Sequence, residues 1–205
     1  MNGFYRFIKG FFGGVCKVLY RIKVVNPEKE VLDKPYIVCA NHTSFMDVVA
    51  MVIAFKGQIR FMAKKEVFPV PILGWFVKSM GAFPVDRKGG DVAAIKKTLE
   101  LLKNGERVGV FPQGTRRPFV DPRTTEIKDG IGMMASRAGV GFVPVFIKTK
   151  KGKLQMFRKT RVIIGDYIPP EELEFTETGK EKYRLISHYV FDKICDLGEN
   201  TEIKW

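Results

Sequence analysis

Two kinds of apolar pattern alternate along this chain. Short runs rich in valine, isoleucine and phenylalanine predict strands, and longer segments with apolar residues every three to four positions predict helices. The predicted strands span residues 36–40, 58–63, 82–86, 107–111, 141–148, 153–157 and 160–166. The predicted helices span residues 45–55, 71–80, 92–104, 131–138 and 179–197. This alternation predicts an α/β fold with a mostly parallel or mixed sheet of about seven strands flanked by helices.

The N-terminal residues 2–21 combine an aromatic apolar stripe with cationic side chains at helical spacing. The apolar positions are Phe4, Phe7, Ile8, Phe11, Phe12, Val15, Val18 and Leu19, and the cationic ones are Arg6, Lys9, Lys17 and Arg21. This pattern predicts an amphipathic helix, which either lies at a membrane headgroup boundary or packs on the domain core. Glycines 10, 13 and 14 weaken it by up to about 1 kcal/mol each, so a break near Gly13-Gly14 is an alternative.

Composition narrows the choice of partner and compartment. The 35 Lys and Arg against 22 Asp and Glu give a net charge of +13, which favours an anionic partner: a membrane surface, a phosphorylated substrate, an acidic carrier protein or nucleic acid. The charge is dispersed and no nucleic-acid-binding motif is present, so we expect no nucleic acid partner. No apolar run reaches the roughly 18–20 residues that cross a bilayer, and no signal peptide is expected. The three cysteines lack paired or metal-site spacing, which predicts free buried thiols and no metal.

The segment from Asn41 to Asp47 carries the first candidate chemistry. His42, one of two histidines, precedes Asp47 by five positions and follows a predicted strand. A neutral imidazole can take a proton from a hydroxyl, and a carboxylate can orient it and stabilise the imidazolium. A structural role is the alternative, because Ser44-x-x-Asp47 is close to a capping box and would leave His42 as an ordinary turn residue. Within one regular helix, positions i and i+5 are about 140° apart, so the pairing requires His42 to lie ahead of the helix.

Three further segments follow the His42 segment along the chain. They are Gly81-Ala-Phe-Pro-Val-Asp-Arg87, Phe111-Pro-Gln-Gly-Thr-Arg116 and Val143-Pro-Val-Phe-Ile147. With the His42 segment, they resemble the four ordered blocks of the glycerolipid acyltransferase family, from about Tyr36 to Ile147. The resemblance implies an acyltransferase catalytic domain, which we expect at residues 31–205, and the amphipathic pattern leads us to expect a membrane-association segment at residues 1–30.

The resemblance implies an activity and a site. The expected reaction moves a fatty acyl group from acyl-carrier protein or acyl-CoA to the sn-2 hydroxyl of 1-acylglycerol 3-phosphate, without a cofactor. His42 and Asp47 are the expected catalytic pair. Arg116, Lys64 and Arg87 are expected to bind the substrate phosphate, because cations, and the arginine fork above all, hold phosphate oxygens. We expect direct attack by the hydroxyl, since no serine lies in a nucleophile-elbow motif.

One residue departs from the family pattern. The third block commonly reads Phe-Pro-Glu-Gly-Thr-Arg, whereas Gln113 stands here in place of the glutamate. An amide keeps the hydrogen-bonding capacity of the glutamate and loses its charge. The sequence therefore does not decide which lipid or glycerol compound accepts the acyl group. Gln113, Gly114 and Thr115 are expected to position the substrate, with Gly114 allowing a positive φ or a close approach.

Other functions remain open at this stage. Within the class, the acceptor could be another lysophospholipid, glycerol 3-phosphate or an amino-lipid. Outside it, the chain could be a basic protein that only binds anionic lipid. The expected location of the enzyme is the cytoplasmic face of the cell membrane, as a peripheral or monotopic protein.

Overall fold

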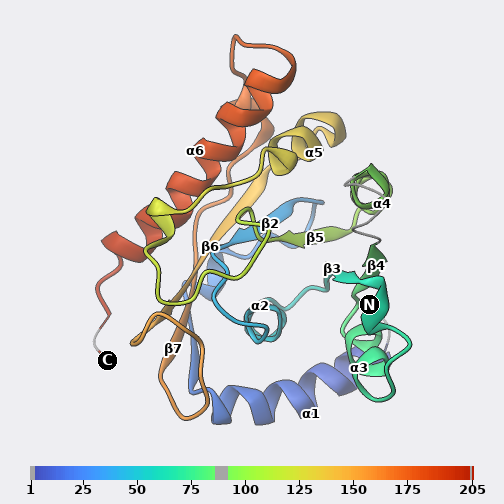
Figure 1. The fold of residues 1–205 in the computed structure, drawn as a ribbon, viewed down its shortest axis with the longest axis vertical. Helices are drawn as coiled ribbons and strands as arrows, with labels where there is room; N and C mark the ends of the chain where they lie inside the picture. Colours follow the sequence, from blue (N-terminus) through green and yellow to red (C-terminus); the bar gives the residue numbers. More distant parts are fainter. Residues whose placement is uncertain (1–2, 86–91, 204) are drawn as a thin grey trace.

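The computed structural model describes residues 3–85, 92–203 and 205, and it has an α/β architecture (Figure 1). Within these residues, seven strands form one sheet in the order β1-β7-β6-β2-β5-β3-β4. The strands are β1 (Ile22–Val25), β2 (Ile37–Ala40), β3 (Ile59–Lys64), β4 (Phe83–Val85), β5 (Arg107–Val110), β6 (Phe142–Thr149) and β7 (Thr160–Ile164). The helices are α1 (Gly3–Leu19), α2 (Asp47–Ala54), α3 (Leu73–Ser79), α4 (Val92–Lys103), α5 (Gly130–Ala138) and α6 (Gly179–Asn200).

The strand directions bring several connections to one edge of the sheet. Strands β6, β2, β5, β3 and β4 are mutually parallel, whereas β7 is antiparallel to β6 and β1 is parallel to β7. The five parallel strands therefore end at the same edge, which we call the carboxyl edge. Strands β7 and β1 run the other way and begin at that edge.

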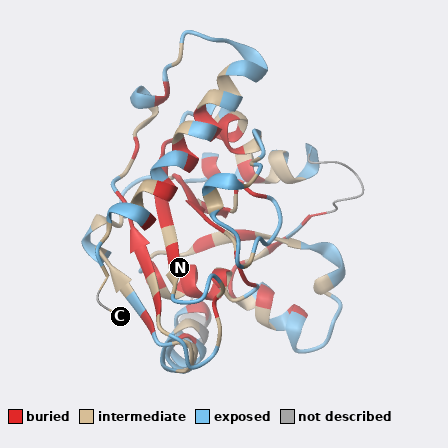
Figure 2. Cartoon of the chain, turned by 60° about the vertical axis from the view of Figure 1, so that its left-hand side comes forward, coloured by how far each residue is buried: buried red, intermediate tan, exposed pale blue. Residues whose placement is uncertain are grey.

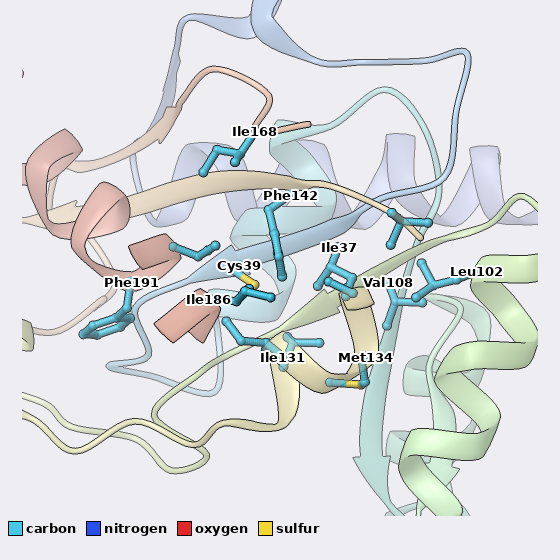
Figure 3. Close-up of a cluster of buried hydrophobic side chains, with 14 of the residues drawn as sticks. Ile37, Cys39, Leu102, Val108, Ile131, Met134, Phe142, Ile168, Ile186 and Phe191 are labelled. Atoms are coloured by element: carbon cyan, nitrogen blue, oxygen red, sulfur yellow. The ribbon is translucent and has the colours of Figure 1, made fainter. Parts of the chain in front are cut away.

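Helices cover both faces of the sheet (Figure 1). Helices α1, α2 and α3 lie on one side, and α4, α5 and α6 lie on the other. Alternate residues of β2 enter the two cores: Val38 packs in the core beneath α2, and Ile37 and Cys39 pack in the core beneath α5 and α6 (Figure 3). Burial on both faces explains why the strand is apolar at every position. Figure 2 shows the same concentration of buried residues along the central strands.

The predicted fold class is confirmed, with two local errors among the strands. Residues 153–157 form turns rather than a strand, since Phe157 has a φ of 59° that a strand does not allow and only Leu154 of this segment is buried. Strand β1 was not predicted, because its four residues follow the amphipathic segment without a clear break and, among the described strands, pair only with the distant β7. It falls within the segment 1–30 and joins the sheet.

Helix α1 is continuous through its glycines. Gly13 is buried, and a Cβ built there would lie 3.4 Å from the Ile53 side chain of α2, so the glycine permits a close approach of the two helices. Lys9 adds a contact by donating to the backbone oxygen of Phe55. This packing against α2 keeps the helix intact where its intrinsic propensity is low.

Candidate active site

His42 lies at the carboxyl edge, in the turn between β2 and α2. Its Nδ1 is 2.9 Å from Oδ2 of Asp47, and the side chains are 16% and 0% exposed, respectively. Helix α2 begins at Asp47, two residues later than predicted, because the Asp47 N–H is bonded to the Ser44 oxygen in a preceding turn. His42 therefore precedes the helix, and the five-residue spacing brings the two side chains together.

The same carboxylate oxygen also holds the backbone of the turn. Oδ2 of Asp47 accepts the N–H groups of Thr43 at 2.5 Å and Ser44 at 2.7 Å. The capping contact and the histidine contact therefore coexist. Because an ionised carboxylate only accepts hydrogen bonds, the proton of neutral His42 lies on Nδ1, and Nε2 keeps a lone pair that can accept a proton.

Neighbouring β5 supplies a ring that supports the imidazole. Phe111, directly after β5, stacks on His42 with a centroid distance of 4.0 Å and an interplanar angle of 15°. Phe61 of β3 stacks in turn on Phe111 at 6.1 Å. The plane of the imidazole is thus set by side chains from the two strands next in order after β2. Sequence reasoning missed this role, although Phe111 opens the third block.

Gln113 joins the His42 turn to Thr125, 12 residues further along the same connection between β5 and α5. Its side chain is only 4% exposed, and Oε1 accepts the backbone N–H of His42 at 2.7 Å. Its Nε2 donates to Oγ1 of Thr125 at 2.8 Å, and that hydroxyl donates to the Pro122 oxygen at 2.6 Å. Both ends of the Gln113 amide are therefore bonded within the protein. The link to Thr125 had no signal in the sequence.

Two further contacts fix the backbone around His42. Asn41 bonds through its side chain to both the N–H and the oxygen of Ile147 in β6, at 2.7 and 3.2 Å. The N–H of Arg117 donates to the His42 oxygen at 2.7 Å. Residues after β2 are thus tied to β6 on one side and to the loop after β5 on the other.

The cations expected to bind phosphate come from different elements that end at this edge. Lys64 ends β3, and Arg116 lies in the loop after β5 next to Arg117; both side chains are exposed, and neither is ion-paired with another described residue. Gly114 has a φ of +66°, in agreement with the predicted positive φ, and Thr115 beside it is exposed. Arg87 lies outside the described residues.

Comparison with known proteins gives a consistent picture. The acyltransferase family profile matches residues 21–148. A 1-acyl-sn-glycerol-3-phosphate acyltransferase of Bacillus subtilis is 29% identical over 202 residues, which cover 97% of this chain and 98% of that protein. The Streptococcus pneumoniae protein of the same name is 38% identical over 172 residues, which cover 83% of this chain and 63% of that protein.

A solved structure is similar over nearly the whole chain. The crystal structure of the 1-acyl-sn-glycerophosphate acyltransferase PlsC from Thermotoga maritima has a TM-score of 0.72 at 25% identity, with 98% of this chain and 81% of that chain covered. The chain therefore belongs to the acyltransferase family and is an O-acyltransferase. The resemblance drawn from the four sequence blocks is confirmed.

Proposed function

We propose that this enzyme transfers a fatty acyl group from a thioester to the sn-2 hydroxyl of 1-acylglycerol 3-phosphate, giving phosphatidic acid. The observation that carries the proposal is the contact between His42 Nδ1 and buried Asp47, which leaves Nε2 as a base at the carboxyl edge. The names of the relatives given above describe enzymes that act on this acceptor, and the similarity to the Bacillus subtilis protein covers 98% of that protein.

The proposed chemistry needs one base and no covalent enzyme intermediate. Nε2 of His42 takes the proton of the acceptor hydroxyl as its oxygen bonds to the thioester carbonyl carbon. Asp47 stabilises the imidazolium that forms. The tetrahedral intermediate then loses the thiolate as the carbon–sulfur bond breaks, and the imidazolium returns the proton to sulfur. Ser44 is no nucleophile in this scheme: it is buried, and its Oγ accepts the Met46 N–H at 3.3 Å.

Substrate binding is assigned to the exposed cations of the carboxyl edge. We propose that Arg116 and Lys64 hold the acceptor phosphate, with Arg87 as a third contributor, since guanidinium and ammonium groups bind phosphate oxygens strongly. Gly114 and Thr115 would position the glycerol backbone. For Gln113, we propose an indirect role, because its amide already holds the His42 N–H. The donor is either acyl-carrier protein or acyl-CoA, since both are anionic.

One assay tests the activity. The purified protein is incubated with 1-oleoylglycerol 3-phosphate and labelled oleoyl-CoA or oleoyl-carrier protein, and labelled phosphatidic acid is measured. His42→Ala should lower turnover by roughly 10³-fold, as expected for loss of a general base. His188→Ala is the matched control, because the second histidine is exposed on α6. Near-normal turnover in His42→Ala would exclude this mechanism, and the two donors compared at equal concentration identify the thioester used.

We further propose that α1 holds the enzyme on the cytoplasmic face of the membrane as a peripheral or monotopic protein. Phe7, Phe11, Val15 and Val18 lie along one stripe of the helix and are 66%, 60%, 47% and 75% exposed. The opposite side of α1 packs on α2. An exposed aromatic stripe of this kind can enter the headgroup boundary. In the described part of the chain, no helix has the length and apolar character needed for a membrane span.

Vesicle co-sedimentation tests the role of α1. Phe7→Ser with Phe11→Ser should release the protein from vesicles, because these two rings stack on each other and are the most exposed aromatic side chains of the helix that the structure describes. Phe12 is left unchanged, since its ring contacts Phe76 of α3. The control is Leu32→Ser with Val92→Ser, two exposed apolar residues outside α1. Equal pelleting of the double phenylalanine variant and the control would assign the anchor to another segment.

A further inference from the structure

The connection between β6 and β7, residues 150–159, combines dense positive charge with exposed apolar side chains. It contains five cations and no acidic residue: Lys150, Lys151, Lys153, Arg158 and Lys159. None of the five is ion-paired with any residue that the structure describes. Met156 and Phe157 are 46% and 67% exposed. Nothing in the proposed acyl transfer uses this loop.

The loop is held in place by contacts with the rest of the domain. Leu154 is 2% exposed and packs in the core beneath α2, so the centre of the loop is anchored. The N–H of Phe157 donates to the Leu19 oxygen at the end of α1, at 2.6 Å. Three residues later, the Thr160 N–H donates to the Arg21 oxygen at 3.3 Å. The exposed Phe157 is therefore held beside the last turn of α1, near Val18, which is 75% exposed.

Phe157 keeps its ring in solvent at a conformational cost. Its φ of 59° lies in the left-handed region, which is unfavourable for a bulky side chain. Core packing does not offset this cost, because the ring is exposed. The backbone bond to Leu19 holds this turn, whereas the exposed ring gains nothing from core packing and is available for a contact outside the folded chain.

Strand direction puts this loop on the side of the active site. Strand β6 is parallel to β2, so residues 150–159 leave the same carboxyl edge as the His42 turn. Helix α1 ends at that edge as well, because β1 begins there. In Figure 1 the loop, drawn in orange below β7, reaches the level of the α1 end.

We propose that residues 150–159 form a second membrane-contact site, which binds an anionic bilayer surface through their lysines and arginines and through Met156 and Phe157. The partner is a bilayer rather than an acidic protein because exposed apolar side chains lie beside the end of α1, a helix that carries an exposed apolar stripe of its own. Cations beside inserted apolar groups are the combination that anionic lipid headgroups attract. Contact at both α1 and this loop presents the carboxyl edge to the lipid surface. The biological setting rests on the proposed function, whereas the binding itself needs no turnover.

Two variants of the full chain separate the charged and apolar contributions. The first is Lys150→Gln with Lys151→Gln and Lys159→Gln. The second is Met156→Gln with Phe157→Asn, in which asparagine suits the positive φ and leaves Leu154 in place. The control is Lys103→Gln with Lys180→Gln and Lys193→Gln, which removes the same charge from exposed positions on α4 and α6. Circular dichroism and urea unfolding check that all variants fold.

Partitioning is measured on phosphatidylcholine vesicles with and without phosphatidylglycerol. The lysine variant should lose roughly a hundredfold on the anionic vesicles, since each of the three cations contributes about fivefold near such a surface, and it should change little on phosphatidylcholine alone. The apolar variant should lose binding to both vesicle types. Binding of both variants at the level of the control overturns the proposal.

Turnover measurements show whether the loop binds the acyl-carrier protein instead of a bilayer. They also keep the test of the loop separate from the test of acyl transfer. Unchanged vesicle binding, with turnover lost on oleoyl-carrier protein but kept on oleoyl-CoA, overturns the proposal and assigns the loop to the carrier. Turnover on acceptor dispersed below its micelle concentration should stay near wild type in both loop variants. Failure of vesicle binding therefore leaves the acyl transfer proposal intact, and loss of activity in His42→Ala is read independently of the loop.

Discussion

Asp47 holds the backbone of the His42 turn and has a proposed chemical role, and two substitutions can separate the two. Its Oδ2 accepts three N–H groups, from His42 Nδ1, Thr43 and Ser44, at 2.5 to 2.9 Å. Asp47→Ala removes the acceptor and leaves two backbone N–H groups unpaired in a fully buried site. Each unpaired group costs about 1–3 kcal/mol, so the loss of unfolding free energy should be about 2–6 kcal/mol.

Asp47→Asn should behave differently because its amide oxygen can accept the same N–H groups. Stability should then fall by about 1 kcal/mol or less, as a neutral acceptor replaces a charged one. Turnover should still fall by roughly 10²-fold or more, since the amide does not offset the charge of the imidazolium. The alanine variant thus reports mainly on the turn, and the asparagine variant on the chemistry.

Urea unfolding and the acyl transfer assay give the two readouts. With a slope of about 2 kcal/mol per molar urea, the midpoint of Asp47→Ala should shift by roughly 1–3 M. Asp166→Asn is the control, since it removes a carboxylate that is 83% exposed and paired only with Lys29 among the described residues. An Asp47→Ala midpoint equal to wild type would refute the structural role. Wild-type turnover in Asp47→Asn would refute the chemical one.

Three further outcomes are expected. Arg116→Ala should raise KM for the acceptor roughly tenfold with a smaller change in kcat, because a phosphate contact away from the reacting hydroxyl stabilises the bound substrate and the transition state equally. Arg137→Ala on α5 is the control, and a fall in kcat with unchanged KM would contradict this role. Gly132→Ala should lower the free energy of unfolding by about 1–3 kcal/mol, since the new methyl group would lie 2.1 Å from a backbone oxygen of α6. Gly130→Ala is the control and should be near neutral, because its methyl group would meet nothing within 4 Å. Gln113→Glu still accepts the His42 N–H and should unfold at higher urea than Gln113→Ala; the reverse order would show that this bond does not hold the turn.

The fold was largely predictable because most strands are buried on both faces. A strand such as β2 reads as an uninterrupted apolar run, and the helices between such runs show their own period. Segment 153–157 carries a similar signal, with Leu154 and Phe157 both apolar, although only the first is buried. Local composition does not distinguish an apolar residue that packs in the core from one that faces outward.

The candidate site was predictable only where its contacts are local. The pairing of His42 with Asp47 needs five residues of sequence and a turn, and both could be read from the chain. The contacts of Phe111 and Gln113 with His42 depend on β5 lying next to β2, which is a property of strand order. The bond from Gln113 to Thr125 also needs the path of a loop with no apolar periodicity.

The long-range contacts explain how one edge could hold both the proposed base and the proposed phosphate site. The loop after β5 bonds to His42 twice, because Gln113 accepts its N–H and Arg117 donates to its oxygen. Arg116 lies between these two attachment points along the chain. A cation carried by this loop therefore keeps its relation to the imidazole without a direct contact between the two side chains. Since a displacement of about 1 Å between bound substrate and base can cost roughly 10²-fold in rate, this double attachment is what the proposed reaction requires of the loop.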